Sequence, residues 1–453
     1  MKHKKFFIGI STAAGIIVIS SISFLSLSPV SLKYSSPRMQ PPLPPGTILS
    51  AEQTAADRNQ MIKYAEDIHP YFALTKNKSQ YTAAKKIYTG ETDGSMTVEQ
   101  FSLATAEYLC FFRDGHTGIE WNPGKILDIE WEYRNKKLYP DNSSLFVTEV
   151  DNVPVSAFFS RIDGMRPAEN EAAQALNYTE FCRYEVVMHL AGGTTAENSV
   201  PVTFSDGSTV SYNFLPAGFS SENTALKKNS WYIDDGIFIV DFNTCTDDAG
   251  LKIIAEKLHQ AVKNGTTKVI LDARGNGGGN STACTRLLAA MDMKPPEYSI
   301  FVRYSPEAEK QCGYFRKSGS YNYRGKGRGK PNPAVHLVVL TDCCTFSSAT
   351  MLAVFVRDGK LGTIIGEPSS NMPSSYGDII RFQLNNSHIA GTISHKRFIR
   401  PDRTKTDERI LIPDIQTASK DALNAAVKYL KEGNTGSVQR DFIKLSTLFV
   451  NKG

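Results

Sequence analysis

The chain has 453 residues, of which 41% are hydrophobic, 10% aromatic and 21% charged, a composition typical of globular proteins. Its length predicts two to four domains. The formal net charge is +5, and Lys2, Lys4 and Lys5 supply three of these units. The rest of the chain is too balanced in charge to favour a nucleic-acid partner, and we expect none.

The first 30 residues have the pattern of a targeting segment. A basic start precedes an uncharged apolar run from Phe6 to about Leu27. Such a run is long enough to span a bilayer, and a cleaved secretory signal has the same pattern. We expect residues 1–30 to be a signal peptide or a membrane anchor, with the rest of the chain exported, either secreted or held on the outer face of the membrane. The Pro-rich residues 31–50 are expected to be a stiff linker.

The seven cysteines favour neither a disulfide framework nor a metal site. Their number is odd over a long chain, although one or two disulfides outside the cell are compatible with it. The adjacent pair Cys343 and Cys344 is interpreted as small apolar packing. We expect no metal and no cofactor.

Residues 51–118 are expected to be a mostly helical segment, because apolar residues recur at three-to-four spacing. The last helix is followed by a turn in which Gly115 and Gly118 bracket His116. A lone histidine is usually structural or solvated. Here it follows an apolar helix directly, so its side chain could project into a neighbouring cleft.

Residues 119–225 change to short strands and turns, with a hairpin centred on Asp206-Gly207. They predict a small α+β module. From residue 226 to 433 the pattern becomes an alternation of buried strands and amphipathic helices, which predicts an α/β core with a mostly parallel sheet and crossover helices. The polar segment Tyr304 to Pro333 is expected to be a long loop, either a surface insertion or a substrate-facing loop. Residues 434–453 are expected to be a C-terminal tail.

Two turns of the predicted core contain candidate catalytic groups. The run VILDARGNGGGNS at residues 269–281 is a buried strand, a glycine turn and the start of a helix. Its glycines do not fit the phosphate-binding patterns, which leaves an oxyanion site or a plain surface turn. The second turn follows the strand Val335 to Thr341 and carries Ser347 at a helix start. Ser347 is a nucleophile candidate or a simple helix cap. Ligands on parallel sheets bind at the carboxyl ends of the strands, and both turns are expected to lie at that edge.

These motifs together resemble the tail-specific, or C-terminal processing, serine peptidase family. The branch that includes tricorn core peptidase and the interphotoreceptor retinoid-binding proteins is the most similar. The matching blocks, in order, are DGHTG at 114–118, LDARGNGGG at 271–279, LTDCCTFSSA at 340–349, and the later IIGEPSS and IPDI. The resemblance implies a crotonase-like catalytic core, and it implies that residues 119–225 stand where relatives carry a PDZ-like peptide-binding domain.

The resemblance also implies roles for individual residues. Ser347 would attack the scissile carbonyl, and His116 would accept the serine proton. The backbone N–H of Ser348 and that of Gly277 or Gly278 would hold the oxyanion.

The acidic member of the site and the lysine of the processing branch are harder to place. That lysine falls on Met372 here, which favours a Ser/His pair, and Lys396 is the only nearby lysine that could substitute. The glutamate of the tricorn-like branch falls on Asp407, with Glu408 one residue away, while the usual glycine there is Ile410. Asp407 and Glu408 are therefore both candidates for the acid, with the alternative that neither serves.

Two functions follow as hypotheses. The first is a serine endopeptidase, secreted or anchored to a membrane, that hydrolyses extended or unfolded polypeptides. The second is a non-catalytic protein that binds peptides or other ligands on the same scaffold. A lipase or esterase is disfavoured because no GxSxG elbow surrounds Ser347.

Overall fold

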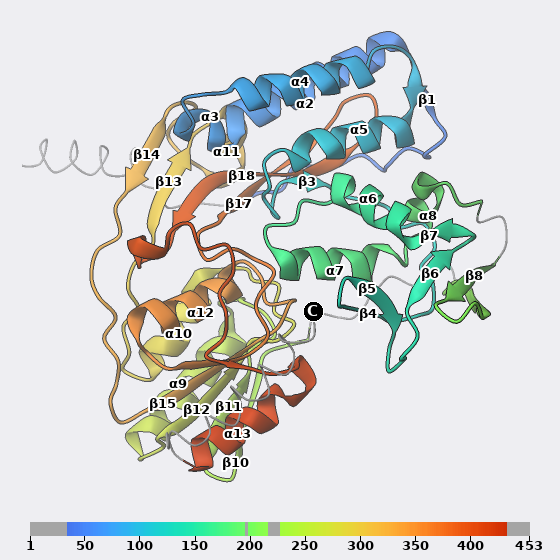
Figure 1. The fold of residues 1–453 in the computed structure, drawn as a ribbon. Coiled ribbons are helices and arrows are strands. Elements are labelled where there is room, and N and C mark those ends of the chain that lie inside the picture. The colour runs from blue at the N-terminus through green and yellow to red at the C-terminus, as the bar shows by residue number, and fades with distance from the viewer. Residues whose placement is uncertain (1–33, 195–197, 216–226, 433–453) are drawn as a thin grey trace, which may run out of the picture.

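A computed structural model describes residues 34–194, 198–215 and 227–432. The predicted leader and the predicted C-terminal tail lie outside these ranges. No helix within them is both long and apolar enough to cross a membrane. Figure 1 shows the N-terminal helices at the top, a middle module beside them and a large α/β core below.

The α/β core is built on a six-stranded sheet with the order β10-β11-β12-β15-β16-β19. All neighbouring pairs from β11 onward are parallel, and only β10 is antiparallel to its neighbour. The predicted mostly parallel α/β fold is therefore present. The strands are β10 (Ser230–Asp234), β11 (Ile237–Asp241), β12 (Lys268–Asp272), β15 (His336–Thr341), β16 (Thr363–Gly366) and β19 (Ile415–Gln416).

Helices cover both faces of this sheet, as a parallel sheet with apolar strands requires. Successive side chains of a strand point to opposite faces. In β11, Phe238 and Val240 pack in the cluster with the three helices of one face, whereas Ile237 and Ile239 pack with the helix of the other face. The first face carries α9 (Ala249–Lys263), α10 (Ser281–Ala290) and α12 (Ser348–Gly359), and the second carries α13 (Ala422–Glu432).

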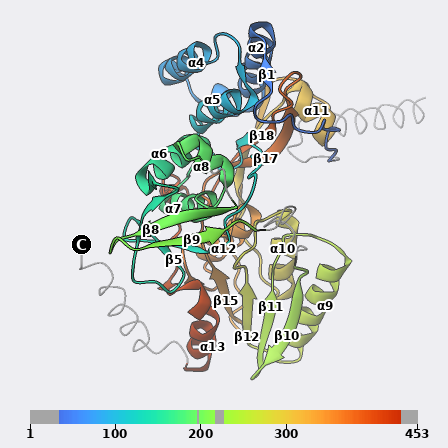
Figure 2. The same ribbon diagram turned by 90° about the vertical axis from the view of Figure 1, so that its right-hand side faces the viewer.

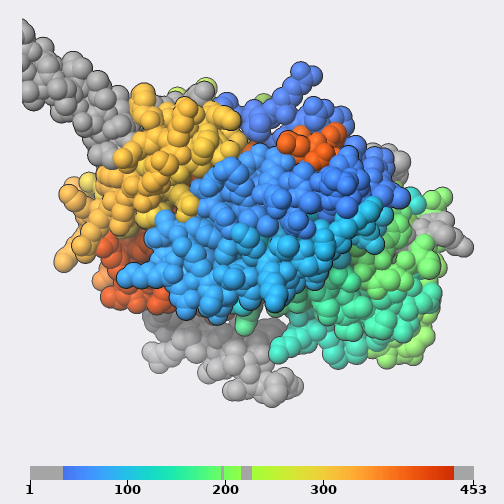
Figure 3. Space-filling model, turned by 90° about the horizontal axis from the view of Figure 1, so that it is seen from above, coloured from blue at the N-terminus to red at the C-terminus, as the bar shows by residue number. Residues whose placement is uncertain are grey.

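A second sheet joins the core to the N-terminal helices. Its order is β14-β13-β18-β17, with the short β3 pairing with β18. The strands are β3 (Gly118–Ile119), β13 (Ser299–Arg303), β14 (Ser320–Tyr323), β17 (Tyr376–Gln383) and β18 (Ala390–Ile399). The N-terminal helices share one hydrophobic cluster with this sheet, and in the view from above they lie in front of part of the molecule beside the gold segment that contains β13 and β14 (Figure 3). They are α2 (Ala51–Ile68), α3 (Tyr71–Leu74), α4 (Ser79–Glu91) and α5 (Val98–Cys110).

The segment Tyr304 to Pro333 is not the long loop that its polarity suggested. It contains the helix α11 (Pro306–Cys312) as well as β14. Ser305 caps α11 by accepting a hydrogen bond from the N–H of Ala308, and the proline that follows Ser305 suits the first helical turn. The strand forms because it pairs with β13, a partner that local sequence does not reveal.

The middle module has a hydrophobic core of its own. A four-stranded antiparallel sheet, β7-β6-β8-β9, packs with three helices beside the α/β core (Figure 2). The expected hairpin is present, and Gly207 turns between its strands with φ of 83°. The elements are β4 (Trp131–Arg134), β5 (Lys137–Pro140), β6 (Val147–Val150), β7 (Val153–Pro154), α6 (Val155–Met165), α7 (Glu171–Phe181), α8 (Glu185–Ala191), β8 (Ser199–Phe204) and β9 (Thr209–Asn213).

The Pro-rich segment is docked on the folded body instead of extending away from it as a spacer. The N–H of Ser35 donates to the carbonyl of Gln311 at 2.9 Å. The N–H of Gln40 donates to the side chain of Gln383 at 2.7 Å, and that side chain donates back to the carbonyl of Gln40. The segment then enters β1 (Ile48–Leu49), which pairs with β2 (Met96–Thr97). These contacts correct the expectation of a stiff spacer that stands off the folded body.

Candidate active site

The glycine turn and the serine turn lie side by side, because they follow β12 and β15, two adjacent parallel strands. Several hydrogen bonds join them, including one from the hydroxyl of Ser348 to the carbonyl of Gly279 at 2.7 Å. The N–H of Gly275 donates to the carboxylate of Asp342 at 3.0 Å, and the N–H of Phe346 donates to the carbonyl of Asn276 at 2.9 Å. The hydroxyl of Thr345 donates to the carbonyl of Ala273, also at 2.9 Å. The two turns thus form one hydrogen-bonded unit.

Ser347 occupies a strained position at the start of α12. Its backbone has φ of 54° and ψ of −123°, outside the regions that L-residues prefer. Its side chain makes no capping hydrogen bond, so it is not the simple helix cap that the sequence left open. Non-glycine residues with such backbones cluster at functional sites. The N–H of Ser347 is held by the side-chain oxygen of Asn371 at 3.0 Å.

Gly278 lies directly against the nucleophile candidate. A Cβ placed on Gly278 would come within 2.6 Å of the Ser347 Cβ and 2.8 Å of the Phe346 carbonyl. Its φ of 100° also favours glycine. The N–H of Gly278 donates to the side chain of Asn276 at 2.9 Å. Of the two predicted glycine donors, Gly277 is the one whose N–H has no acceptor among the described residues.

Replacing Gly278 with alanine is expected to lower kcat/KM about a hundredfold, the loss typical of a damaged oxyanion site. The added methyl group would displace Ser347 or the turn beneath it. Steady-state hydrolysis of an unfolded protein measures the effect. Gly265→Ala is the matched control, because Gly265 also has positive φ, at 98°, but its Cβ would meet open space. Equal losses in both variants would mean that backbone strain, and not contact with Ser347, causes the effect.

His116 is fixed in a tight turn after α5. The N–H of His116 donates to Asp114 Oδ1 at 3.0 Å, and the hydroxyl of Thr117 donates to Asp114 Oδ2 at 2.5 Å. Its carbonyl accepts a hydrogen bond from the hydroxyl of Thr392 on β18 at 2.7 Å. The second sheet therefore holds the histidine turn in place.

The imidazole of His116 lies beside the serine turn. Its ring centroid is 4.7 Å from that of Phe346, the residue before Ser347. Within the described residues, neither imidazole nitrogen has a hydrogen-bond partner, although both are buried. A general base in a ligand-free site often reaches its partner only in the substrate complex. The fold thus brings the two predicted catalytic residues, Ser347 and His116, to one place.

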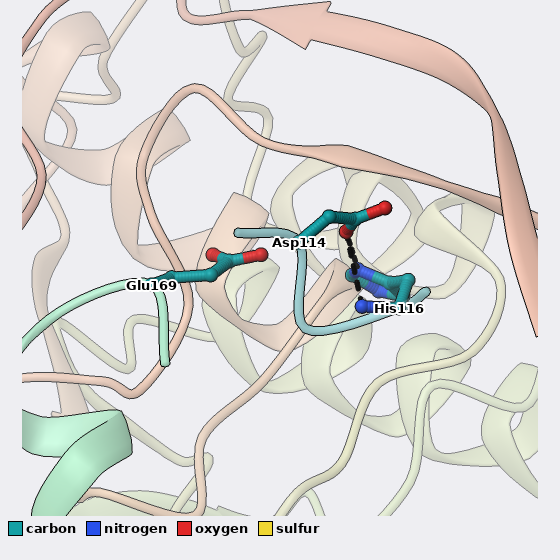
Figure 4. Close-up of side chains that lie close together, drawn as sticks. All are labelled: Asp114, His116 and Glu169. Atoms are coloured by element: carbon teal, nitrogen blue, oxygen red, sulfur yellow. Dashed lines mark hydrogen bonds and ion pairs between the residues drawn. The ribbon is translucent and has the colours of Figure 1, made fainter. Parts of the chain in front are cut away.

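Three carboxylates surround the imidazole, and none of them was predicted as the acid. Asp114 Oδ1 lies 3.7 Å from Nδ1 of His116, and Glu169 projects from the middle module toward the same turn (Figure 4). Asp378, on β17, adds a further negative charge. Burial alone would lower the pKa of His116, but these carboxylates outweigh it and raise the pKa above its usual range. The imidazolium that forms during proton transfer is thereby stabilised.

Asp114, His116 and Glu169 are also the one group that could offer a metal three ligands among the described residues, with ligand atoms within 4.8 Å of one another. Atoms bound to one tetrahedral zinc ion, about 2.0–2.2 Å from the metal, lie roughly 3.3 Å apart. Both carboxylates also accept hydrogen bonds from backbone N–H groups. The arrangement fits a hydrogen-bonded catalytic support better than a metal site.

Asp407 and Glu408 do not lie with the catalytic candidates. Both are exposed. Glu408 forms an ion pair with Arg400 at 2.5 Å, and neither residue is among the charges that act on His116. The structure therefore favours the alternative that neither residue assists His116, because Glu408 pairs instead with Arg400, which binds Asp358 of α12. Asp114 had a local signal, its position in the DGHTG motif, but Glu169 and Asp378 had none.

Lys396 is not available as an alternative base. Its ammonium group is buried and pairs with Asp378 at 2.5 Å. Burial alone would lower the pKa of Lys396, but the charge of Asp378 outweighs it and raises the pKa well above its usual range. Met372 stands in the lysine position of the processing branch, and its backbone N–H donates to Glu169. The geometry favours a Ser/His pair.

A strained serine at a helix start, an adjacent glycine turn and a buried histidine held by the second sheet form an arrangement typical of serine hydrolases. Residues 237–417, from β11 to just after β19, match the model of peptidase family S41. This match covers the α/β core, which is similar to that of the family, and it supports a serine peptidase. No curated protein sequence matches the chain.

Solved structures agree with this assignment at the level of the fold. The structure of mature CPAF complexed with lactacystin has a TM-score of 0.56 and 12% identity, covering 88% of this chain and 100% of that one. The crystal structure of mature CPAF has a TM-score of 0.53 and 13% identity, covering 89% of this chain and 99% of that one. The similarity spans the helices and the middle module as well as the core.

Proposed function

We propose that this peptidase is an exported serine endopeptidase that cleaves extended or unfolded polypeptides, with Ser347 as nucleophile and His116 as general base. The observation that carries the proposal is the position of Ser347. It is a strained serine on a strand-to-helix turn, in contact with Gly278 and next to Phe346, whose ring lies beside an imidazole that makes no hydrogen bond to the described residues. The apolar leader at residues 1–30 supports export.

The proposed reaction follows the general logic of acyl transfer. The hydroxyl of Ser347 attacks the scissile carbonyl while His116 takes its proton. The N–H groups of Gly277 and Ser348 hold the negative oxygen of the tetrahedral intermediate. His116 then protonates the leaving amine, and water releases the acyl group by the same steps in reverse order. Asp114 holds the histidine turn and stabilises its charged form.

The second sheet offers a way to bind an extended substrate. β17 is the terminal strand of this sheet, and a Cβ placed on Gly377 near its start would lie 3.9 Å from His116 Cε1. A peptide that added to such an edge as a further strand would bring its carbonyl groups to the catalytic residues. Only an unfolded or flexible segment can do this, which supports the proposed substrate class.

The test uses the full-length protein and one substrate protein in two states, folded and reduced-alkylated. We expect internal cleavage of the unfolded state and little cleavage of the folded state, with fragments identified by mass spectrometry. A fluorophosphonate probe should attach to the peptide that contains Ser347. Labelling of a different serine, or release of terminal residues only, would contradict the proposal. Ligand binding without cleavage or labelling would favour the non-catalytic binding protein.

A further inference from the structure

We infer that Glu169 is a positioning residue through which the middle module holds both catalytic residues in their working geometry. The inference rests on the proposed roles of Ser347 and His116. Glu169 lies between α6 and α7, far in sequence from either catalytic turn, and its side chain is only 2% exposed. A carboxylate is rarely buried so completely unless its oxygens are well satisfied.

The two carboxylate oxygens of Glu169 bind different parts of the site. Oε1 accepts the backbone N–H of Gly115, the residue before His116, at 2.9 Å. Oε2 accepts the side-chain amide of Asn371 and the backbone N–H of Met372, both at 2.6 Å. One side chain thus joins the histidine turn to the loop after β16.

Asn371 carries this connection to the nucleophile. Its Nδ2 donates to Glu169, while its Oδ1 accepts the N–H of Ser347 at 3.0 Å. Asn371 is itself buried. The amide is oriented by the carboxylate, because only its nitrogen can donate to Glu169 and only its oxygen can accept from Ser347. The strained backbone of Ser347 is therefore stabilised by a hydrogen bond whose geometry depends on Glu169.

The middle module is fastened to the core at this same point. Asn170 caps α7 by accepting from the N–H of Ala173, and its Nδ2 donates to the carbonyl of Ser369 at 3.1 Å. The guanidinium of Arg409 donates to the backbone carbonyl of Glu169. The position of Glu169 relative to the catalytic turns is thus fixed by backbone as well as side-chain contacts.

Glu169 has an electrostatic effect in addition to its hydrogen bonds. Its carboxylate is one of the charges that raise the pKa of His116. Burial raises the pKa of Glu169 itself, yet all three of its partners are N–H donors, which favours the ionised form at neutral pH. Loss of this charge would let the pKa of His116 fall, so the catalytic base would become neutral at a lower pH.

The test is Glu169→Gln in the full-length protein, assayed with the unfolded protein substrate. An amide has one accepting oxygen, so it can keep only one side of the connection. We expect kcat/KM to fall about 10- to 100-fold, mostly through kcat, as for other residues that orient catalytic groups. The acidic limb of the kcat/KM profile should move to lower pH. Labelling of Ser347 by the fluorophosphonate should slow by a similar factor.

Asn371→Ala tests the second half of the connection. It should slow labelling of Ser347 as Glu169→Gln does, and the double variant should be little worse than the more damaged single variant, because both changes break one chain of contacts. Glu171→Gln is the matched control. It removes the same charge two residues further along the chain, where the side chain is exposed. It should leave the rate and the pH profile unchanged.

Failure of this inference and failure of the proposed function give different results. The inference is overturned if Glu169→Gln keeps at least half of the activity and its acidic limb does not move. If that variant does not fold, an Asn371→Ala variant with unchanged labelling overturns it. Wild-type protein that neither cleaves nor reacts with the probe would instead refute the proposed catalytic roles themselves.

Discussion

Ser347→Ala and His116→Ala are each expected to lower kcat/KM for an unfolded polypeptide by at least about a thousand-fold. The first removes the nucleophile and the second removes its base. Because the two groups act in one proton transfer, the double variant should be no worse than the more damaged single variant. Single-turnover cleavage would measure the loss of peptide-bond hydrolysis in each variant, and fluorophosphonate labelling would measure the loss of serine reactivity.

The variants must remain folded for this result to be informative. Alanine at position 347 meets the same backbone strain as serine, so we expect an unchanged thermal midpoint for Ser347→Ala. Ser160→Ala and His336→Ala are matched controls, since both side chains are exposed and His336 lies at the opposite end of β15 from Ser347. Full activity in Ser347→Ala would exclude it as the nucleophile. If His116→Ala kept its activity while Ser347→Ala lost it, the general base would have to be another residue.

The sequence predicted the part of the fold that depends on local pattern. The strands β11, β12, β15 and β16 are apolar runs buried on both faces, and such runs are recognisable without tertiary information. The start of α12 at Ser348 and the adjacency of the two catalytic turns also followed, because neighbouring parallel strands end at one edge of the sheet. These elements carry Ser347 and the glycine turn.

The parts that were missed depend on contacts between distant segments. The Pro-rich segment was expected to be a stiff spacer, but its backbone is held by Gln383, more than 300 residues away. Glu169 reaches the site only because the middle module packs beside the core. Asp378 lies in β17 between two residues that pair with β18, and its backbone has φ of 51°. Periodicity and turn chemistry contain no signal for any of these contacts.

The separation of Asp407 and Glu408 from His116 has a related explanation. An ungapped count assumes that the loop before β19 has the same length and course as in relatives. Here the loop turns so that Glu408 meets Arg400, which is fully buried. Glu408 therefore belongs to a group of charges with Arg400 and Asp358, the last of which lies on α12. This difference leads to a prediction about stability.

Arg400→Met is expected to lower the free energy of unfolding by about 3–5 kcal/mol, the cost of leaving a buried charge without its partner. The guanidinium is 0% exposed and binds Asp358 on α12 through two hydrogen bonds, at 2.6 and 3.1 Å. Asp358 is itself only 1% exposed. Methionine fills a similar volume but leaves this carboxylate unpaired.

The urea midpoint of unfolding would measure this loss, and two further variants separate its causes. Arg400→Met combined with Asp358→Leu should recover much of the stability, because two apolar side chains can replace a buried ion pair. Glu408→Gln should cost no more than about 1 kcal/mol, since its side chain is 42% exposed and solvent screens its charge. Its kcat/KM should stay near that of wild type, because Glu408 supports the fold here and does not act on His116. A stable Arg400→Met protein, or a Glu408→Gln protein that is folded but inactive, would contradict this assignment and return Glu408 to the catalytic site.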